Sequence, residues 1–487
     1  MTSSILSLLQ QPESKILEFK RDLSSPQPLL KSLIAFANSA GGRLIIGVND
    51  EHKIIGVTDP LAEEERICNL IADNIAPRLV PNVELTSLNN KTLLIVEVFP
   101  SSSRPHYFKK QGPEQGVYVR LGSTNRQADP ALIAELQRGV LGISFDEIPM
   151  PQLSIQDLDL ETAEKLFGNK RTLDEKSLLT LKLLCKEQGR LVPTQGAILL
   201  FGKDREMYFP DAWVQCGRFR GTTKVEIFDQ MEIHDLLPLA VDSIEMFLKK
   251  HAFKSAKFSG MRRKDMWSIP LTMLREAIIN ALVHSDYSHR GSPIRIAFFD
   301  DRIDIESPGI LLPGMTIEDM KNGTSKIRNP VIVRIFRELG LVEQWGSGVK
   351  RIFAEAKELG LPEPQITEIA TGIRFSIRLS ESNSEKLSEK WVGEQVSEQV
   401  SEQVSEQVSE QVSEQVKAML GYCSEEPKSR QELLAAADLS NAYMNYKRHI
   451  VPLLEQGILE MTIPDKPRSR LQKYRLTEQG KLILSSN

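Results

Sequence analysis

The chain has 487 residues, of which 41% are hydrophobic and 26% charged, and its formal net charge is −4 at pH 7. A length of this order divides into about three or four domains. The slightly acidic balance excludes nucleic-acid binding driven by the charge of the whole molecule, so any such binding has to come from local basic patches.

The four cysteines are scattered along the chain, without the close pairs that zinc sites use or the framework of a disulfide-rich domain. A reducing, cytoplasmic setting is therefore expected. No apolar run approaches the length of a membrane span, and the first ten residues lack the pattern of a signal peptide. We accordingly expect no membrane partner.

Residues 1–137 alternate helical and strand patterns, which predicts an α+β domain. A helix over 28–40 should stop at the pair Gly41-Gly42, and the apolar run 43–48 should form a buried strand that leads into a turn. The remaining expected elements are a helix over 61–76 and strands over 83–85, 92–99 and 117–121.

Three motifs follow one another in this region. They are Glu13-x₄-Glu18-Phe-Lys20, Ala35-Phe-Ala-Asn-x-x-Gly41-Gly42 and Gly47-Val-x-Asp50. Together with Tyr118–Asn125 they resemble the Schlafen/AlbA-type domain over essentially its whole length. The resemblance implies nucleic-acid binding and, as in the Schlafen members that cut RNA, assigns Glu13, Glu18 and Asp50 to a metal-dependent carboxylate site. Such a site holds Mg²⁺ or Mn²⁺ against a phosphate and activates water.

The sequence departs from that family at Asn49, where a further acid is usual. A structural role also fits, because Glu18 and Lys20 can pair on a strand and Asp50 can cap its turn. Nucleic-acid binding and cleavage therefore stay open as separate functions. The candidate phosphate contacts are Lys20, Arg120 and Arg126, with Arg21, Arg104, Lys109 and Lys110 beside them.

Residues 138–260 begin with a connector over 144–152 that contains prolines and acidic residues and marks a domain boundary. Helices are predicted over 157–167 and 174–188, and segments of buried sheet over 193–202 and 212–219. This middle α/β region shows no grouping of residues that would indicate a catalytic site. We expect it to pack on the next module and complete its core.

The segment Leu274–Ser288 has a helical apolar rhythm. Glu276 and Asn280, four residues apart, stack on a neighbouring face of that helix. A carboxylate beside a carboxamide suits a hydrated Mg²⁺ that bridges to phosphates. The alternative is an ordinary amphipathic helix with two solvated polar residues.

Two strands, 294–299 and 302–306, should follow that helix as a hairpin. The turn Ser307-Pro308-Gly309 comes next. Further on, Gly346 and Gly348 lie at the start of a helix, where glycine lets backbone N–H groups approach an anion.

The order of these elements, a helix with Glu276 and Asn280, then a hairpin and two glycine-containing turns, resembles the Bergerat (GHKL) ATP-binding fold of gyrase and histidine kinases. The resemblance is to the divergent RecG-like C-terminal form of that fold. A Walker A sequence is absent from the whole chain, so a P-loop helicase is not expected. The resemblance implies a Bergerat-type ATPase that uses ATP and Mg²⁺, in which Asn280 holds the metal and Glu276 positions or deprotonates water. Gly346 and Gly348 would cradle phosphate.

The adenine position is assigned by the same resemblance to Asp304 or to the Ser307–Gly309 turn. Here the usual Asp-x-Gly-x-Gly is replaced by Glu306-Ser-Pro-Gly309, which leaves adenine recognition and hydrolysis open. His284, Asp286 and Tyr287 follow the helix within reach of the pocket, or else serve as capping and packing residues. Residues 326–329 belong to a lid whose cations meet phosphates, or to a solvated loop.

A Ser-Glu-Gln-Val repeat fills 394–416 within a linker over 381–416. A four-residue step overshoots a helical turn by about 40°, so the repeat forms either a semi-rigid spacer or a disordered one. Residues 417–487 resemble a winged helix-turn-helix that begins at the capping box Ser429-x-x-Glu432. Its candidate DNA contacts are Lys447 and Arg448 on the recognition helix and Arg468 and Arg470 on the wing, with protein docking as the alternative.

The sequence thus predicts a multidomain α+β protein. Its expected parts are a Schlafen/AlbA-type α+β domain (1–137), a middle region (138–260), a Bergerat-like α/β sandwich (261–380), a linker (381–416) and a winged helix-turn-helix (417–487). The expected function is that of a homo-oligomeric, ATP- and nucleic-acid-binding transcriptional regulator or related DNA- or RNA-acting factor. A metal-dependent Schlafen-like nuclease, acting on RNA or tRNA in stress or phage defence, is the alternative.

Overall fold

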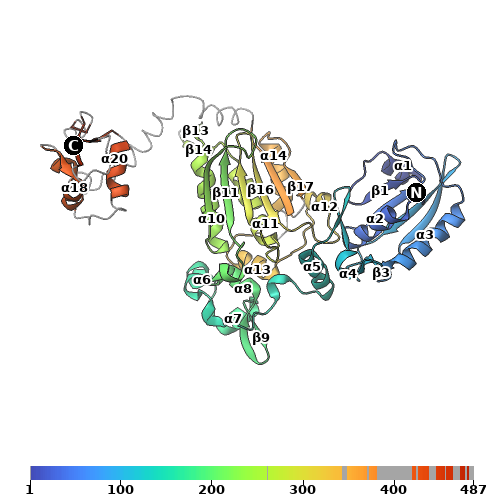
Figure 1. The fold of residues 1–487 in the computed structure, drawn as a ribbon. Helices are drawn as coiled ribbons and strands as arrows, with labels where there is room; N and C mark the ends of the chain where they lie inside the picture. Colours follow the sequence, from blue (N-terminus) through green and yellow to red (C-terminus); the bar gives the residue numbers. More distant parts are fainter. Residues whose placement is uncertain are drawn as a thin grey trace. The chain divides into compact units, whose positions relative to one another are not determined.

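The computed structural model describes residues 2–259, 262–342, 348–369, 372–380, 419–423, 426–437, 446–455, 457–463, 472–477 and 480–481. The chain splits into two compact units, Met1–Ser388 and Glu389–Asn487, and each is described by itself (Figure 1). Helices and sheets are mixed throughout, which confirms the α+β, multidomain prediction. Within the described residues, no helix has both the length and the apolar character needed to cross a membrane.

The N-terminal sheet has the strand order β1-β2-β5-β4. Its strands are β1 (Leu17–Lys20), β2 (Gly42–Ile46), β4 (Asn82–Leu88) and β5 (Lys91–Val98). β1 and β2 are parallel and the other pairs antiparallel, because α2 (Pro26–Asn38) carries the chain across between β1 and β2. The predicted helices 28–40 and 61–76 correspond to α2 and α3 (Pro60–Asn74), and the predicted strands are present.

Both faces of this sheet are covered by hydrophobic clusters. Alternate side chains of a strand point to opposite faces, so neighbouring residues of one strand enter different clusters. Leu44 and Ile46 of β2 pack in the cluster that contains α2 and α3, whereas Ile45 packs in a second cluster with α1 (Thr2–Leu9). The remaining elements of this region are β3 (Ile75–Ala76), β6 (Tyr107–Phe108), α4 (Gly112–Gln115), β7 (Tyr118–Leu121), β8 (Thr124–Gln127) and α5 (Pro130–Leu141).

Two predictions for the middle region are wrong. The expected helix 174–188 ends early: α7 (Glu175–Thr180) is followed by a hairpin of β9 (Leu184–Glu187) and β10 (Arg190–Pro193). Gln188 and Gly189 form its two-residue turn, with φ of 48° and 79°, the left-handed conformation that suits the twist of a hairpin.

The expected sheet segment 193–202 is instead the helix α8 (Gln195–Phe201), N-capped by Thr194, whose side chain accepts from Ala197 N at 3.2 Å. Every residue of α8 from Gly196 to Phe201 is buried. A helix buried on all sides has no polar face and therefore no helical periodicity. The other elements here are η1 (Phe145–Glu147), η2 (Ile155–Asp157), α6 (Leu160–Phe167), η3 (Gly168–Lys170) and α9 (Arg205–Tyr208).

A six-stranded sheet with the order β12-β11-β15-β16-β18-β17 forms the centre of the first unit. Its strands are β11 (Val214–Phe219), β12 (Ile227–Ile233), β15 (Ile294–Phe298), β16 (Arg302–Pro308), β17 (Gln365–Ile369) and β18 (Gly372–Arg378). β11 pairs with β15, so the expected boundary at 260/261 divides strands of one sheet. One hydrophobic cluster runs from Met150 to Leu379, and the middle region thus completes the core of the next module, as predicted.

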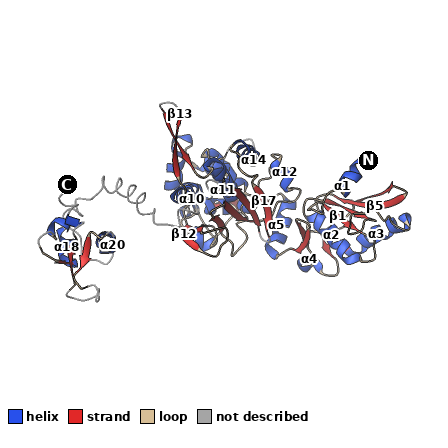
Figure 2. Cartoon of the chain, turned by 90° about the horizontal axis from the view of Figure 1, so that it is seen from above, coloured by secondary structure: helices blue, strands red, loops and turns tan. Residues whose placement is uncertain are grey.

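Helices α10 (Leu237–His251), α11 (Leu271–His284) and α14 (Gly348–Glu358) lie on one side of this sheet (Figure 2). The helix predicted within the segment 274–288 is α11, which ends at His284, so Asp286 and Tyr287 follow the helix as expected. The buried Asn329 caps the C-terminal end of α11: its Nδ2 donates to Val283 O at 3.0 Å and to Ser285 O at 2.7 Å. The further elements are β13 (Lys254–Ser259), β14 (Arg262–Trp267), α12 (Ile317–Lys321) and α13 (Pro330–Glu338).

The second unit contains a three-stranded sheet of order β19-β21-β20. Its elements are β19 (Lys428–Ser429), α18 (Arg430–Ala436), the π-helical turn η4 (Tyr446–Ile450), α20 (Val451–Glu455), β20 (Leu459–Met461) and β21 (Lys473–Leu476). The capping box of Ser429 and Glu432 is present, and the predicted hairpin is formed by β20 and β21. The side chains of Lys447 and Arg448, together with Arg468, Arg470 and the repeat, lie outside the described residues.

Candidate nucleotide-binding site

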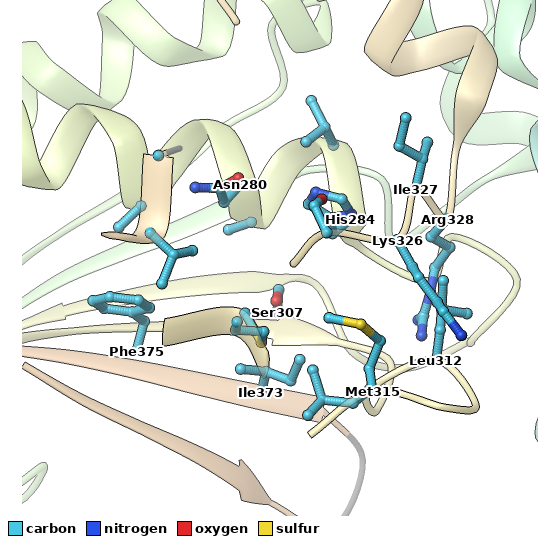
Figure 3. A pocket seen from close by; sticks show the side chains of 18 of the residues that line it. Asn280, His284, Ser307, Leu312, Met315, Lys326, Ile327, Arg328, Ile373 and Phe375 are labelled. Carbon is cyan, nitrogen blue, oxygen red and sulfur yellow. The ribbon is translucent and has the colours of Figure 1, made fainter. Parts of the chain in front are cut away.

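A cavity of about 450 Å³ lies between α11 and strands β16 and β18 of the six-stranded sheet. Residues 309–315 and 323–328 close its sides, and the start of α14 closes one end. Figure 3 shows Asn280 and His284 of α11 on one side of this space, with Ser307, Ile373 and Phe375 of the strands across from them. Its volume lies in the range of small-molecule sites, which is roughly 300–1,000 Å³.

Glu276 and Asn280 lie on the cavity wall, one helical turn apart. Asn280 Nδ2 donates to Glu276 Oε1 at 3.2 Å, and Arg351 Nη2 lies 2.8 Å from Glu276 Oε2. The start of α14 comes so close that a Cβ at Gly348 would lie 1.6 Å from Glu276 Oε1. The structure thus brings Glu276, Asn280 and Gly348 together, as predicted, while Gly346 lies outside the described residues.

Strand β16 forms the opposite wall through Ile305 and Ser307. Asp304 does not line the cavity, because alternate strand residues face opposite sides. It is buried instead beside Arg302, with Nε 3.2 Å from Asp304 Oδ2. The expectation that Asp304 recognises adenine is therefore wrong, whereas Ser307 and Gly309 of the alternative turn line the cavity.

At the end of α11, His284 is uncharged, and Asp286 and Tyr287 form hydrogen bonds within the protein. Burial, followed by the nearby Arg328, lowers the pKa of His284 to about 4, so the imidazole is neutral at pH 7 and adds no positive charge to the cavity. Asp286 Oδ1 accepts from Ser288 N at 3.0 Å, and Tyr287 OH donates to Leu282 O at 2.7 Å. Tyr287 therefore stabilises the end of the helix, and Asp286 stabilises the turn that follows it.

Residues 323–328 supply two cations of different character. Lys326 is exposed, and its Nζ donates to Pro313 O at 2.6 Å. Arg328 is buried: Nε lies 3.2 Å from Glu135 Oε1 of α5, and Nη2 donates to Ile310 O. Its guanidinium packs against Gly309, whose φ is +97° and where a Cβ would lie 1.7 Å from Arg328 Nη1.

In the N-terminal domain, Glu18 is a buried carboxylate with protein partners. It forms an ion pair with the buried Arg120, accepts from Ser32 Oγ at 2.8 Å, and lies 2.6 Å from Lys20 Nζ. Arg120 also donates to Asn125 Oδ1 at 2.9 Å. The expectation that Arg120 contacts nucleic acid is wrong, because its side chain is 1% exposed.

The other two expected metal ligands do not join Glu18. Glu13 is exposed, and its Oε1 accepts from Phe19 N at 2.9 Å. Asp50 is also exposed, and the turn there is capped by Asn49, whose Oδ1 accepts from Lys53 N at 2.8 Å. Over the described part of the chain, no group of three or more His, Cys, Asp or Glu residues could hold a metal ion.

An ion pair that the sequence motifs did not indicate joins the cavity wall to the N-terminal domain. Glu368 Oε1 of β17 accepts from Lys15 Nζ at 2.5 Å and from Leu311 N at 3.0 Å. Nearby, Gly314 N donates to Ser39 O at 2.9 Å. Lys15 and Glu368 are 353 positions apart, so no local pattern could have paired them.

The fold and cavity define a multidomain protein with a cavity of small-molecule size beside α11. Residues 13–129 match the family described as Schlafen, AlbA_2, and residues 291–379 match the Putative ATP-dependent DNA helicase recG C-terminal family. The chain therefore carries a Schlafen/AlbA_2 domain and a RecG-like C-terminal domain, as the motifs indicated. The second match begins after α11, so Glu276 and Asn280 lie outside it. These two domains indicate a nucleic-acid-related, ATP-binding function.

Residues 414–477 match the C-terminal domain of the Fic-like family, filamentation induced by cAMP. Among solved structures, the DIP2311 protein of Corynebacterium diphtheriae is 19% identical with a TM-score of 0.41, over 99% of this chain and 98% of that one. The N-terminal domain of a putative ATP-dependent DNA helicase RecG-related protein of Nitrosomonas europaea is 29% identical with a TM-score of 0.20, over 25% of this chain and 91% of that one. Comparison with curated proteins gives no match.

Proposed function

We propose that this protein is a nucleotide-responsive, nucleic-acid-binding factor of the transcriptional-regulator type, which binds ATP with Mg²⁺ in the cavity beside α11. The observation that supports the proposal is the placement of Glu276, Asn280 and Gly348 at one end of a cavity of about 450 Å³. The rest of the cavity combines apolar residues, with Phe375 and Ile373 on one wall, with the polar residues of 323–328.

The polar residues fit a magnesium-bound triphosphate. Because Asn280 Nδ2 is engaged by Glu276, its carboxamide oxygen is the atom left to ligate a hard cation. The first turn of α14, which starts at Gly348, presents backbone N–H groups suited to phosphate oxygens. Bound Mg²⁺ would neutralise phosphate charge, and Glu276 would orient or deprotonate water there.

Regulation is proposed because the cavity wall and the N-terminal domain share contacts. Leu311 lines the cavity, and its N–H binds the carboxylate that also holds Lys15. A nucleotide that shifts residues 309–315 would therefore change the contacts of the Schlafen/AlbA_2 domain. The exposed Arg126 of that domain remains a candidate phosphate contact. The second unit, which we expect to act as a winged helix, supplies a further binding surface.

Calorimetry of the full chain with ATP and Mg²⁺ tests the site. We expect the wild type to bind and Asn280→Ala to lose most of its affinity, because the metal loses an oxygen ligand. Asn82→Ala, an exposed asparagine of β4 outside the cavity, is the matched control and should bind like the wild type. Absence of binding by the wild type would overturn the proposal.

The regulatory part is tested by titrating labelled DNA and RNA with the protein, with and without ATP and Mg²⁺. We expect the dissociation constant for one of these nucleic acids to change at least fivefold when nucleotide is present, which corresponds to a coupling free energy of about 1 kcal/mol. The change should disappear in Asn280→Ala. Equal affinities for nucleic acid with and without ATP would contradict the regulatory role, but would not contradict ATP binding itself.

A further inference from the structure

A second cavity of about 240 Å³ lies where α5 of the N-terminal domain meets the wall of the first cavity. Residues 142–145, which follow α5, form one side, and Leu312 and Pro313 form another. Leu312, Ile327 and Arg328 line both cavities, so the two are neighbours that share a wall. No role follows from the nucleotide proposal for this second space.

Three arginines line the second cavity: Arg104 from the loop after β5, Arg138 from α5, and Arg328. Arg104 Nη1 donates to Ser101 O at 2.6 Å, whereas its Nε is buried and has no hydrogen-bond partner among the described residues. Arg328 is 8% exposed, and its Nη1 is likewise buried without a hydrogen-bond partner in the part of the chain that the structure describes. Arg138 lies over the ring of Phe145, 5.4 Å from the centroid.

The acidic residues of this cavity do not satisfy those donors. Glu135 Oε1 pairs with Arg328 Nε at 3.2 Å, and Asp286 Oδ1 accepts from the backbone and hydroxyl of Ser288. Burial lowers the pKa of the Arg104 guanidinium, and no carboxylate of the described residues opposes this shift. Buried donors of a charged group are costly to leave unpaired, which makes this cavity a receptive site for an anion.

We propose that the second cavity binds a phosphoryl group through Arg104, Arg138 and Arg328. Guanidinium groups present planar pairs of N–H donors that match phosphate oxygens. The cavity is smaller than the roughly 300 Å³ at which small-molecule sites usually begin, so it suits phosphate or pyrophosphate rather than a whole nucleotide. The phosphoryl group comes either from a free phosphorylated molecule or from the backbone of nucleic acid held by the adjoining Schlafen/AlbA_2 domain.

Calorimetry of the full chain with pyrophosphate, in the presence of a metal chelator, tests this site separately from the first cavity. We expect the wild type to bind pyrophosphate, and Arg104→Met and Arg138→Met each to weaken binding roughly tenfold, since each removes charge-assisted hydrogen bonds. Arg190→Met, at an exposed position of the β9–β10 hairpin, is the matched control and should bind normally. Asn280→Ala should also bind normally, because it alters only the first cavity.

Two further arms identify the source of the phosphoryl group. If pyrophosphate displaces a short single-stranded oligonucleotide, and the two arginine variants weaken both ligands, the site binds backbone phosphate. If pyrophosphate binds without displacing the oligonucleotide, the site takes a free phosphorylated molecule. The proposal is overturned if the wild type binds no pyrophosphate, or if Asn280→Ala abolishes binding while Arg104→Met and Arg138→Met retain it.

Discussion

Asn280 Nδ2 donates to Glu276 Oε1 across 3.2 Å, one helical turn back along α11. The bond turns the carboxamide so that its oxygen points away from Glu276. It also holds one carboxylate oxygen, while Arg351 lies 2.8 Å from the other. Both side chains are therefore oriented before a ligand arrives, which lowers the entropy that binding has to overcome.

Glu276→Gln should separate binding from hydrolysis. The amide retains the size of the carboxylate but cannot accept a proton from water, so ATP affinity should stay within a few-fold of wild type. Any ATP hydrolysis should fall by roughly 10²–10⁴, the usual contribution of a general base. Single-turnover hydrolysis and calorimetry on the same preparation measure the two effects. Glu338→Gln, which alters a pair with Arg171 away from the cavity, is the control. Unchanged hydrolysis would remove Glu276 from catalysis.

Arg120→Met should destabilise the N-terminal domain. It leaves Glu18 buried with less compensation, at a cost of about 3 kcal/mol, the lower end for breaking a buried pair, because Lys20 and Ser32 still contact the carboxylate. Native-state hydrogen exchange of the amides in β1 and β2 measures the loss. Adding Glu18→Gln to Arg120→Met should restore part of the stability. Wild-type protection in the single variant would show that the pair contributes little.

Arg126→Met should weaken nucleic-acid binding and leave folding unchanged. Its side chain is exposed on β8, so it makes no contribution to the core. Loss of one phosphate contact should reduce the slope of log affinity against log salt by about 1. Binding measured at several salt concentrations, with the thermal transition as a control, checks this. An unaltered salt slope would exclude Arg126 from the interface.

Asp146 should make the first unit less stable as pH rises. Its buried Oδ2 accepts from Val331 N at 2.7 Å and Ile332 N at 3.0 Å, yet burial raises its pKa to about 7. Between about pH 4 and 7 the unfolded chain loses this proton while the folded one keeps it, so stability falls over that window and then levels.

Asp146→Asn should abolish that part of the pH dependence, which thermal unfolding at pH 5 and pH 8 would reveal as a smaller difference than in the wild type. Burial lowers the pKa of His251 to about 4, so this group acts in the opposite direction, with stability rising from about pH 4 to 6.5. Because His251 is present in both the wild type and the variant, its contribution to the pH dependence of stability cancels in the comparison. An equal pH dependence in wild type and variant would contradict the assignment.

The elements predicted correctly are those whose signal is local. α2 and α11 show helical spacing, and β15 and β16 form the predicted hairpin of the six-stranded sheet. The turn after β16 and the start of α14 came from glycine patterns, and Gly309 and Gly348 do lie at close approaches of the backbone. Local periodicity and glycine placement therefore identified elements that line the cavity, while the expectation that they form one site came from the resemblance to a known fold.

The errors arise where distant parts of the chain decide the outcome. α8 has no polar face because elements far along the chain surround it, and its apolar run therefore resembled a strand. Glu18 matched a catalytic motif, but its partner Arg120 is 102 positions away. Asp304 and the Ser307–Gly309 turn were the two candidates for the adenine position. Only the register of β16 shows which side of the sheet Asp304 faces.

The ion pair between Lys15 and Glu368 has a consequence for anyone who divides the protein into fragments. Both side chains are at most 10% exposed. A fragment that ends after α5 would leave the ammonium without its counter-ion, and one that starts later would leave a carboxylate with only a backbone amide. Expressed alone, each piece would expose a charged surface that the intact chain neutralises, so its solubility and its affinity for polyanions would not report those of the whole molecule.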